Sequence, residues 1–329
     1  MSSDAYTVLG AAPTKEQLQL ATWNNRLKQI EDQIFYEHFL LAWFRSAMDT
    51  QLLSAGGEQF ELPLGIGTNP NGGMIDPDTG MEQNTFDPNE LAVYHRAWAG
   101  YNLVKSLRQQ ASNKGSNKNW DIYKNHMDVT IESLKETWSS QIFNGSGTGK
   151  DANSIVLLVP ATATTSQTTA VGGITPSATK YWWRSQAIDM NGENAASTLE
   201  ANMLTMLNRI KIQKGKVELW VGDQTTAETY EKNQTRFLID STTKIGDNNY
   251  DVLKYKSAVV EFDADAPTGE FRALNRKCIK MAVDPAYYLK WTSEKETPNV
   301  PFKTQKQIVL CFNFCRSNPR RLGCLFNIS

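Results

Sequence analysis

The longest regular pattern in the chain runs from Asn119 to Gly145, and it predicts a single helix. Large apolar residues recur there at steps of three and four, which places them along one stripe of a 3.6-residue helix. Asn119 is suited to the N-cap, and Asn144-Gly145 is a typical helix stop. At 1.5 Å per residue the helix is roughly 36 Å long, so we expect a strut as wide as a domain. The stripe consists of Tyr123, Met127, Ile131, Leu134, Trp138 and Ile142.

The first 55 residues predict a helical arm. Thr14-Lys15-Glu16-Gln17 has the form of a capping box, and no proline or glycine occurs between Pro13 and Gly56. From Phe35 to Phe44 apolar residues cover most sides of this helix. A helix that is apolar all round needs partners on all sides. We expect another subunit to supply some of these partners.

A glycine- and proline-rich stretch from Gly56 to Trp98 follows the arm and breaks any regular helix. Its flanks, Glu58–Ile66 and Glu90–Trp98, alternate between apolar and polar residues as strands do. The pattern predicts a two-limbed β-excursion with an irregular tip. Limbs of about 20 residues reach roughly 65 Å, too far to fold back on one core. Because an isolated two-stranded ribbon is marginal in water, we expect this one to lie on a neighbouring subunit.

Opposite charges gather in two parts of a chain whose net charge is only −1. Seven acids and one base, Arg96, lie in the excursion; eleven bases and three acids lie between Phe271 and Ser329. This separation predicts docking between subunits, although ordinary solvated surface is the alternative. The acids are Glu58, Glu61, Asp76, Asp78, Glu82, Asp87 and Glu90. The candidate docking bases are Arg272, Arg276, Lys277, Lys280, Lys303, Lys306, Arg316, Arg320 and Arg321, and Lys290 and Lys295 complete the eleven.

The second half of the chain predicts a compact α/β layer followed by strands and turns. Ser197-Thr198-Leu199-Glu200 opens a helix as a capping box, Val217–Val221 is a strand, and a further helix runs from about Thr225 to Phe237. Ser154–Val159 is a short apolar run that we assign to a buried strand. The later strands are expected at Ala258–Phe262, Phe271–Asn275, Ile279–Val283 and Gln307–Phe314.

Motifs for phosphate and calcium binding are incomplete. Gly145–Asp151 superficially resembles a phosphate loop, but its glycine spacing is short and Asp151 replaces the hydroxyl that binds magnesium. Asp76, Asp78, Glu82 and Asp87 lack the central glycine and the bidentate glutamate of a calcium loop. We therefore predict neither a cofactor nor a metal.

Catalytic constellations are missing as well. His38, His95 and His126 lie far apart in the sequence, and we interpret all three as structural. The cysteines Cys278, Cys311, Cys315 and Cys324 have no local histidine and no paired spacing that indicates zinc. Trp182-Trp183 is suited to stacking a base or a sugar, but packing is the interpretation that we favour. No catalytic residue is predicted, and we expect the protein not to be an enzyme.

Composition limits the cellular compartments and the partners that we expect for the protein. The chain has no apolar run of 18 residues and no basic-then-apolar leader, so we expect neither a membrane span nor secretion. Four clustered cysteines are too few for a disulfide framework, which favours synthesis in a reducing cytoplasm. Because the net charge is near zero, the chain has no overall positive field that would attract nucleic acid. It can still enclose DNA without binding it tightly.

The order of these parts resembles the major capsid proteins of tailed bacteriophages, which share the Hong Kong 97-type fold. Besides the arm, the excursion and the strut, the similarity rests on four stretches. They are Ile142-Phe143-Asn144-Gly145, Tyr255–Glu261, Pro267–Asn275 and Asn318–Leu325. The resemblance covers nearly the whole chain. It explains why the arm and the ribbon need partners, and why opposite charges gather in two parts of the chain.

The resemblance implies an α+β fold of five parts. Residues 1–55 form the N-terminal helical arm, 56–110 the E-loop β-hairpin and 111–153 a P-domain with the spine helix. Residues 154–270 form an α/β A-domain, and 271–329 provide strands that return to both domains.

By the same resemblance, the chain is the major head protein of a virion and self-assembles as pentamers and hexamers into an icosahedral shell. Assembly in the host cytoplasm would involve a scaffolding protein and a portal. Packaged double-stranded DNA would meet the inner face without sequence specificity, a decoration protein is possible, and no membrane is involved. Because no lysine occurs between Lys28 and Lys105, the E-loop cannot form an isopeptide weld, and we expect a non-covalent shell. Since only about 55 residues precede the ribbon, we expect a separate scaffolding protein.

Three other interpretations stay open at this point. An encapsulin-like compartment shell has the same fold around a cargo enzyme. A cytoplasmic α/β enzyme predicts a monomer or small oligomer with a concave polar site. A carbohydrate-binding tail protein would use Trp182-Trp183.

Overall fold

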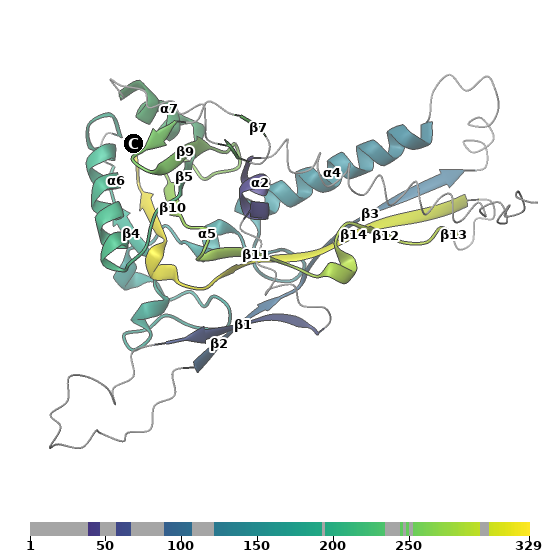
Figure 1. The fold of residues 1–329 in the computed structure, drawn as a ribbon, viewed down its shortest axis with the longest axis horizontal. Helices are drawn as coiled ribbons and strands as arrows, with labels where there is room; N and C mark the ends of the chain where they lie inside the picture. The colour runs from purple at the N-terminus through teal and green to yellow at the C-terminus, as the bar shows by residue number, and fades with distance from the viewer. Residues whose placement is uncertain are drawn as a thin grey trace, which may run out of the picture.

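The computed structural model describes residues 39–46, 57–66, 89–106, 122–192, 195–233, 244–245, 248–249, 253–296 and 303–329. In Figure 1 these residues form an elongated molecule with three parts. One part is a sheet with two helices against it. The second is a long helix beside a narrow sheet, and the third is a two-stranded ribbon that leaves the body below them.

The narrow sheet is built on β14 (Lys303–Arg316). β3 (Ala97–Ser106) pairs with it antiparallel from Ala97 opposite Phe312 to Ser106 opposite Lys303. On its other edge β14 pairs with β11 (Ile279–Val283), β12 (Lys290–Trp291) and β13 (Lys295–Glu296).

The strut predicted from the sequence is present as α4 (Ile122–Asn144), which lies along β3 and β14 (Figure 1). Five members of the predicted stripe, Met127, Ile131, Leu134, Trp138 and Ile142, are buried, and Lys135 and Phe143 are buried beside them. The side chain of Tyr123 and the expected cap Asn119 lie outside the described residues. Packing against the sheet therefore stabilises this helix, as a 3.6-residue apolar stripe requires.

The wider sheet has six strands in the order β4-β15-β10-β5-β9-β8. β4 runs parallel to β15 and β5 runs parallel to β9, while the other neighbours are antiparallel. Helices α6 (Ala195–Ile212) and α7 (Gln224–Asn233) pack on one face. The strands are Gln186–Asp189 (β4), Leu219–Gly222 (β5), Lys254–Tyr255 (β8), Ala258–Phe262 (β9), Phe271–Leu274 (β10) and Gly323–Phe326 (β15).

Both faces of this sheet are buried. On one side Trp220 stacks on Phe271, with ring centroids 5.4 Å apart, and contacts the core that contains Met203 and Met206 of α6. On the other side Leu219 and Val221 join the larger core around α4. Alternate residues of β5 thus serve two different cores, as the twofold repeat of a strand dictates.

The predicted strand at Ser154–Val159 is wrong. The segment forms a short helix, α5 (Ile155–Leu158), whose first turn is capped by the Ser154 hydroxyl as it accepts a hydrogen bond from the Leu157 N–H at 3.4 Å. Ile155 and Leu158 are buried on one side. A short apolar run does not distinguish a buried strand from a helical turn, and here the serine cap decides the outcome.

The expectation for the end of the arm is also corrected. Helix α2 (Phe39–Ser46) is apolar on most sides, but Leu40, Leu41, Trp43 and Phe44 are buried in the core of the same chain. Phe44 packs on Phe314 of β14 at 4.9 Å between ring centroids. This part of the arm therefore needs no second subunit, and residues 1–38 lie outside the described part.

Several element boundaries differ slightly from expectation. α6 begins at Ala195, two residues before the proposed cap Ser197, and α7 is described only to Asn233. β14 is longer than the strand expected there because its first half extends beside β3. The remaining elements are Thr164–Ser166 (η2), Tyr181–Trp183 (η3), Pro285–Tyr287 (η4), Pro319–Arg321 (η5), and a small pair of strands, Lys244–Ile245 (β6) and Asn248–Asn249 (β7).

Candidate inter-subunit surfaces

The ribbon consists of β1 (Gln59–Gly65) and β2 (Asn89–His95), which pair antiparallel along their whole length. Residues 97–106, which we had assigned to the excursion, belong instead to the narrow sheet as β3. The excursion therefore ends at the junction between β2 and β3. Its tip, residues 67–88, lies outside the described part.

The base of the ribbon packs on its own chain, so the expected contact with a neighbouring subunit concerns its outer face and the part beyond the base. Phe60, Ala92 and Tyr94 point inward and are buried, and the Val93 N–H donates to the Gly172 carbonyl at 3.0 Å. Gly172 has φ +61°, and a Cβ there would lie 2.8 Å from the Tyr94 ring. Only glycine allows this close approach with a left-handed backbone.

A polar clamp holds the ribbon where β2 meets β3. The Tyr94 hydroxyl donates to the Arg316 carbonyl at 2.8 Å, and Asn313 donates to the His95 carbonyl at 2.6 Å. Arg96 forms a buried ion pair with Asp284, and its guanidinium lies over the Phe60 ring at 4.7 Å. Burial raises the pKa of Tyr94 well above its ordinary value, so this hydroxyl keeps its proton and remains a donor. The clamp fixes the direction in which the ribbon leaves the body.

The outer face of the ribbon is open to solvent. Pro63 lies opposite Leu91, and Glu61 lies opposite Val93; Glu58, Glu61, Pro63 and Leu91 are exposed. Glu90 instead pairs with Lys180 of the same chain. The other four predicted acids, Asp76, Asp78, Glu82 and Asp87, lie outside the described residues.

Two of the predicted docking bases, Arg272 and Arg316, are buried inside the chain, so they cannot meet a partner's acids. Arg316 donates to the carbonyls of Leu158 (2.5 Å) and Trp183 (3.0 Å), and it lies over the Trp183 ring at 4.8 Å. Those carbonyls lie at the ends of two short helices, where partial negative charge accumulates. Burial lowers the pKa of Arg316 to about 10. Arg272 pairs with Glu270 and donates to the Val159 carbonyl at 3.3 Å.

The other predicted bases differ in exposure. Lys306 is buried, whereas Lys277 and Lys303 are exposed. Lys280, Arg276, Arg320 and Arg321 are half-buried. Arg276 lies 3.8 Å from the Glu218 carboxylate, and Arg321 donates to the Gln213 carbonyl at 3.2 Å. The charge count of this segment therefore overstates the number of bases that a partner can reach.

The exposed bases of the narrow sheet gather on one face. The strand registers place Lys290, Lys295 and Lys303 on the same side as Trp98, because each lies opposite a residue of that side. Trp98 and Tyr287 are 49% and 46% exposed and meet edge to face at 5.1 Å. We call Trp98, Tyr287, Lys290, Lys295 and Lys303 the lysine face. Among the side chains that the structure describes on these strands, none is acidic.

The opposite side of the narrow sheet is covered by α4, whose own outer surface is acidic. The Tyr101 hydroxyl reaches the Thr137 hydroxyl at 2.5 Å across the sheet–helix contact. Asp128, Glu132 and Glu136 are exposed and follow one another at steps of four, which aligns them along the helix. This layer therefore has one basic and one acidic surface.

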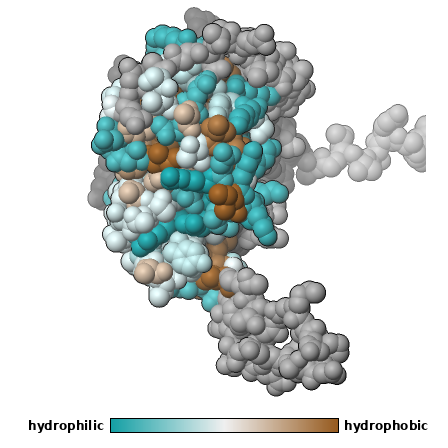
Figure 2. All heavy atoms as spheres, turned by 90° about the vertical axis from the view of Figure 1, so that its left-hand side faces the viewer, coloured by the Kyte–Doolittle hydropathy of each residue, from teal (hydrophilic) through white to brown (hydrophobic). Residues whose placement is uncertain are grey.

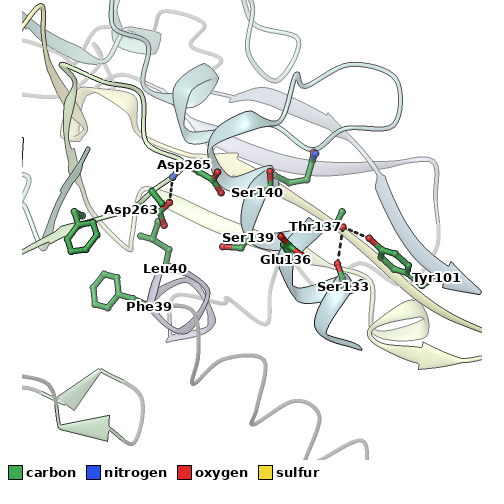
Figure 3. Close-up of a pocket in the computed structure, with 13 residues that line it drawn as sticks. Phe39, Leu40, Tyr101, Ser133, Glu136, Thr137, Ser139, Ser140, Asp263 and Asp265 are labelled. Carbon is green, nitrogen blue, oxygen red and sulfur yellow. Dashed lines mark hydrogen bonds between the residues drawn. The ribbon is translucent and has the colours of Figure 1, made fainter. Parts of the chain in front are cut away.

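A groove of about 740 Å³ lies where α4, α2 and the end of β9 meet (Figure 3). Phe39, Tyr101 and the half-exposed Phe262 provide apolar surface, and Glu136, Asp263 and Asp265 provide the charge. The Asp265 N–H donates to the Asp263 carboxylate at 2.9 Å, which orders this turn. Figure 3 shows the hydroxyls of Ser133, Ser139 and Ser140 along the α4 side. No sequence signal points to this groove, because its walls come from four separate segments, β3 with Tyr101 included.

The end of α6 carries the most exposed large hydrophobic residue of the described chain, Ile212, at 77%. Lys211, Lys214 and Lys216 are exposed around it. We call these four residues the α6 knob. Elsewhere on the side where α6 lies, Figure 2 shows hydrophobic residues standing singly among hydrophilic ones.

Within the described residues, no three His, Cys, Asp or Glu side chains are grouped as metal ligands. All four cysteines are buried thiols, and burial raises the pKa of Cys278 to about 11 and of Cys324 to about 12. Trp183 is buried and donates to the Val171 carbonyl at 2.9 Å, so it packs and does not present a stacking surface. None of the helices in the described part is long and apolar enough to cross a membrane.

No protein-family model matches the chain, and no curated protein matches it in sequence. Solved structures do match its shape. The capsid of cyanophage A-1(L) aligns over 86% of this chain and 91% of its own, with a TM-score of 0.67 and 13% identity. The capsid of a native GTA particle aligns over 86% and 91%, with a TM-score of 0.55 and 12% identity. The SrpI encapsulin of Synechococcus elongatus aligns over 73% and 76%, with a TM-score of 0.52 and 12% identity. The chain therefore has the Hong Kong 97-type capsid fold.

Proposed function

We propose that the chain is the major capsid protein of a tailed double-stranded DNA bacteriophage. Its copies assemble as hexamers and pentamers into an icosahedral shell that encloses the genome, and its role is structural. The observation that carries this proposal is the likeness to a cyanophage capsid over nearly the full length of both chains. Surfaces that one copy leaves open, above all the outer face of the ribbon and the lysine face, support it further.

The ribbon and the lysine face are complementary, which gives a mode of assembly. The acidic excursion of one copy docks on the lysine face of a neighbour, which presents three lysines and two exposed aromatic rings. Trp98 and Tyr287 provide apolar area, and the lysines select an acidic partner. We propose that the contact is non-covalent, since the excursion lacks the lysine from which the isopeptide bond of some relatives starts.

The remaining partners are proposed from the fold. A scaffolding protein and a portal take part in assembly, and the finished shell leaves room for a decoration protein. The DNA is held by enclosure and without sequence specificity, which suits a chain of net charge −1. An encapsulin-like compartment shell is the second candidate, because an encapsulin shares the fold.

Expression of the full chain, followed by size-exclusion chromatography and negative-stain microscopy, tests the proposal. We expect hexamers, pentamers or closed shells, and a single monomer band when boiled particles run on an SDS gel. A chain that stays monomeric at high concentration would overturn the proposal, and ladders of linked subunits would overturn the non-covalent mode. Double-stranded DNA in particles purified from infected cells separates a phage shell from an enzyme compartment.

Reversing the charge of the lysine face tests the mode of assembly. Lys290→Glu, Lys295→Glu and Lys303→Glu together should prevent or strongly weaken assembly while the monomer stays folded. Lys150→Glu, an exposed lysine away from that face, is the matched control and should assemble normally. Equal assembly of both variants contradicts docking on the lysine face.

A further inference from the structure

The groove between α4, α2 and the end of β9 is one of two features that the docked ribbon does not use. It is large enough for several side chains, at about 740 Å³, and it combines an apolar wall with an acidic rim. Phe39 and Phe262 offer apolar surface, and Glu136 and Asp265 are exposed at its mouth. Such a groove suits a hydrophobic side chain that is flanked by positive charge.

The α6 knob is the other unused feature, and it has the complementary character. Ile212 projects into solvent, whereas the other apolar residues at the same end of α6, Leu207 and Ile210, are buried. Lys211, Lys214 and Lys216 lie within four residues of it in the sequence and are exposed, and no acid is present between residues 209 and 217. A lone hydrophobic residue is ordinary on a surface. Three exposed lysines close to it in the sequence, however, favour binding to a partner surface that carries acids.

We propose that the α6 knob of one copy inserts into the groove of the next copy, with Ile212 against Phe39 and Phe262. Lys211 and Lys214 then face Glu136 and Asp265. This inference rests on the proposed self-assembly and names a second contact surface within it.

The occupant is a second copy because one chain carries both halves of the contact on different surfaces. The groove is built from α2, β3, α4 and the end of β9, while the knob lies at the end of α6. A patch that fits a different patch of an identical molecule forms a head-to-tail contact, and repetition of such a contact gives a ring when the rotation between copies divides a full turn. Three acids at the groove match three lysines around the knob, so the contact is neutral when formed.

A designed disulfide tests the contact directly. We would replace Ile212→Cys and Ala264→Cys in the full chain, since Ala264 is an exposed residue that lines the groove. The native cysteines are buried, so they give little background. Mild oxidation of assembled particles should yield dimers and a ladder of higher multimers on a non-reducing gel. Each single replacement is a control and should stay monomeric on that gel.

Charge exchange provides a second measurement that does not need a disulfide. Lys211→Glu with Lys214→Glu should raise the protein concentration needed for assembly by about tenfold or more. Adding Glu136→Lys and Asp265→Lys should restore assembly, because the pairs are then reversed. Lys150→Glu should leave assembly unchanged.

The outcomes separate the two proposals. If the unaltered chain forms shells but the double-cysteine chain gives only monomers or an internal bond, and reversal of the lysines has no effect, the knob-in-groove contact is overturned alone. If the unaltered chain forms no shells or rings, the proposed function fails and this contact falls with it. Cross-linked ladders together with rescue by the exchanged charges establish the contact.

Discussion

The two large sheets of the molecule differ in how many of their faces the chain covers. The six-stranded sheet is buried on both sides, so β5, β10 and β15 consist of buried residues throughout. The second half of β14 is also buried on both faces, but its first half has α4 on one side only, and β3 alternates there between exposed residues such as Trp98 and inward residues such as Leu103. A sheet covered twice supplies the stability of the monomer. A sheet covered once leaves a surface for the next copy.

Trp220→Ala should have the largest effect on folding, because this residue lies in the twice-covered sheet. It removes a fully buried indole that stacks on Phe271, and we expect a loss of about 3–5 kcal/mol in the free energy of unfolding. Urea unfolding followed by circular dichroism measures it. A loss below about 1 kcal/mol would show that this sheet is not the stable one.

Asp284→Ala tests the clamp that joins the ribbon to the once-covered sheet. The change leaves the buried Arg96 guanidinium without this carboxylate, so the free energy of unfolding should fall by about 3 kcal/mol. Urea unfolding is again the measurement. The variant Glu228→Ala, which removes an exposed ion pair with Lys232, is the control and should leave the free energy of unfolding nearly unchanged.

Alkaline pH should destabilise the monomer through buried thiols. Burial raises the pKa of Cys278 to about 11 and of Cys324 to about 12, above the ordinary value of 9.0. The folded chain therefore holds these protons more tightly than the unfolded chain does. The resulting stability is fully present below pH 9 and is lost as the pH rises towards 11 and 12. Unfolding midpoints at pH 7 and pH 10 should differ, and Cys278→Ala should make the decline shallower. Equal midpoints would contradict the expectation.

Gly172→Ala should loosen the ribbon at moderate cost. The new Cβ meets the Tyr94 ring at 2.8 Å and the backbone has φ +61°, so a loss of about 1–2 kcal/mol is expected. Hydrogen exchange should rise selectively at the Val93 amide, which donates to Gly172. Gly173→Ala also has a positive φ but open space around its Cβ, so it separates the steric clash from backbone strain.

Trp98→Ala should have the smallest effect on folding and a clear effect on assembly. Its side chain is half exposed on the lysine face, and the free energy of unfolding should change by less than about 1 kcal/mol. Particle yield should nevertheless fall, because an aromatic anchor at an interface is lost. Trp98→Ala and Trp220→Ala form a matched pair, because the same residue type is replaced in each of the two sheets. Equal effects of the two on monomer stability would erase the contrast between the sheets.

Sequence reasoning predicted the elements whose periodicity is long. α4 was predicted because its apolar stripe extends over six turns, and β9 and β11 were predicted within their exact observed bounds. α5 was mistaken for a strand because four residues are too few for either period to show. The end of the excursion was misplaced because β3 continues the alternation of β2, and only pairing with β14 separates the two.

The contact surfaces were less predictable than the fold. A charge count cannot tell that Arg272 and Arg316 are buried, because their hydrogen-bond acceptors are carbonyls far away in the sequence. The lysine face becomes visible only once strand registers are known, since its lysines come from three strands. The groove was missed altogether because its walls come from segments that are far apart in the sequence, from Phe39 to Asp265.

Pro63, on the outer face of the ribbon, has a consequence for the subunit before it assembles. β1 lies at the edge of the ribbon, and an exposed strand edge invites the strands of other molecules to add to it without limit. A proline interrupts the row of backbone N–H groups that such growth needs. Pro63 therefore disfavours fibre formation by unassembled subunits. It does not hinder contacts between subunits that are made through side chains.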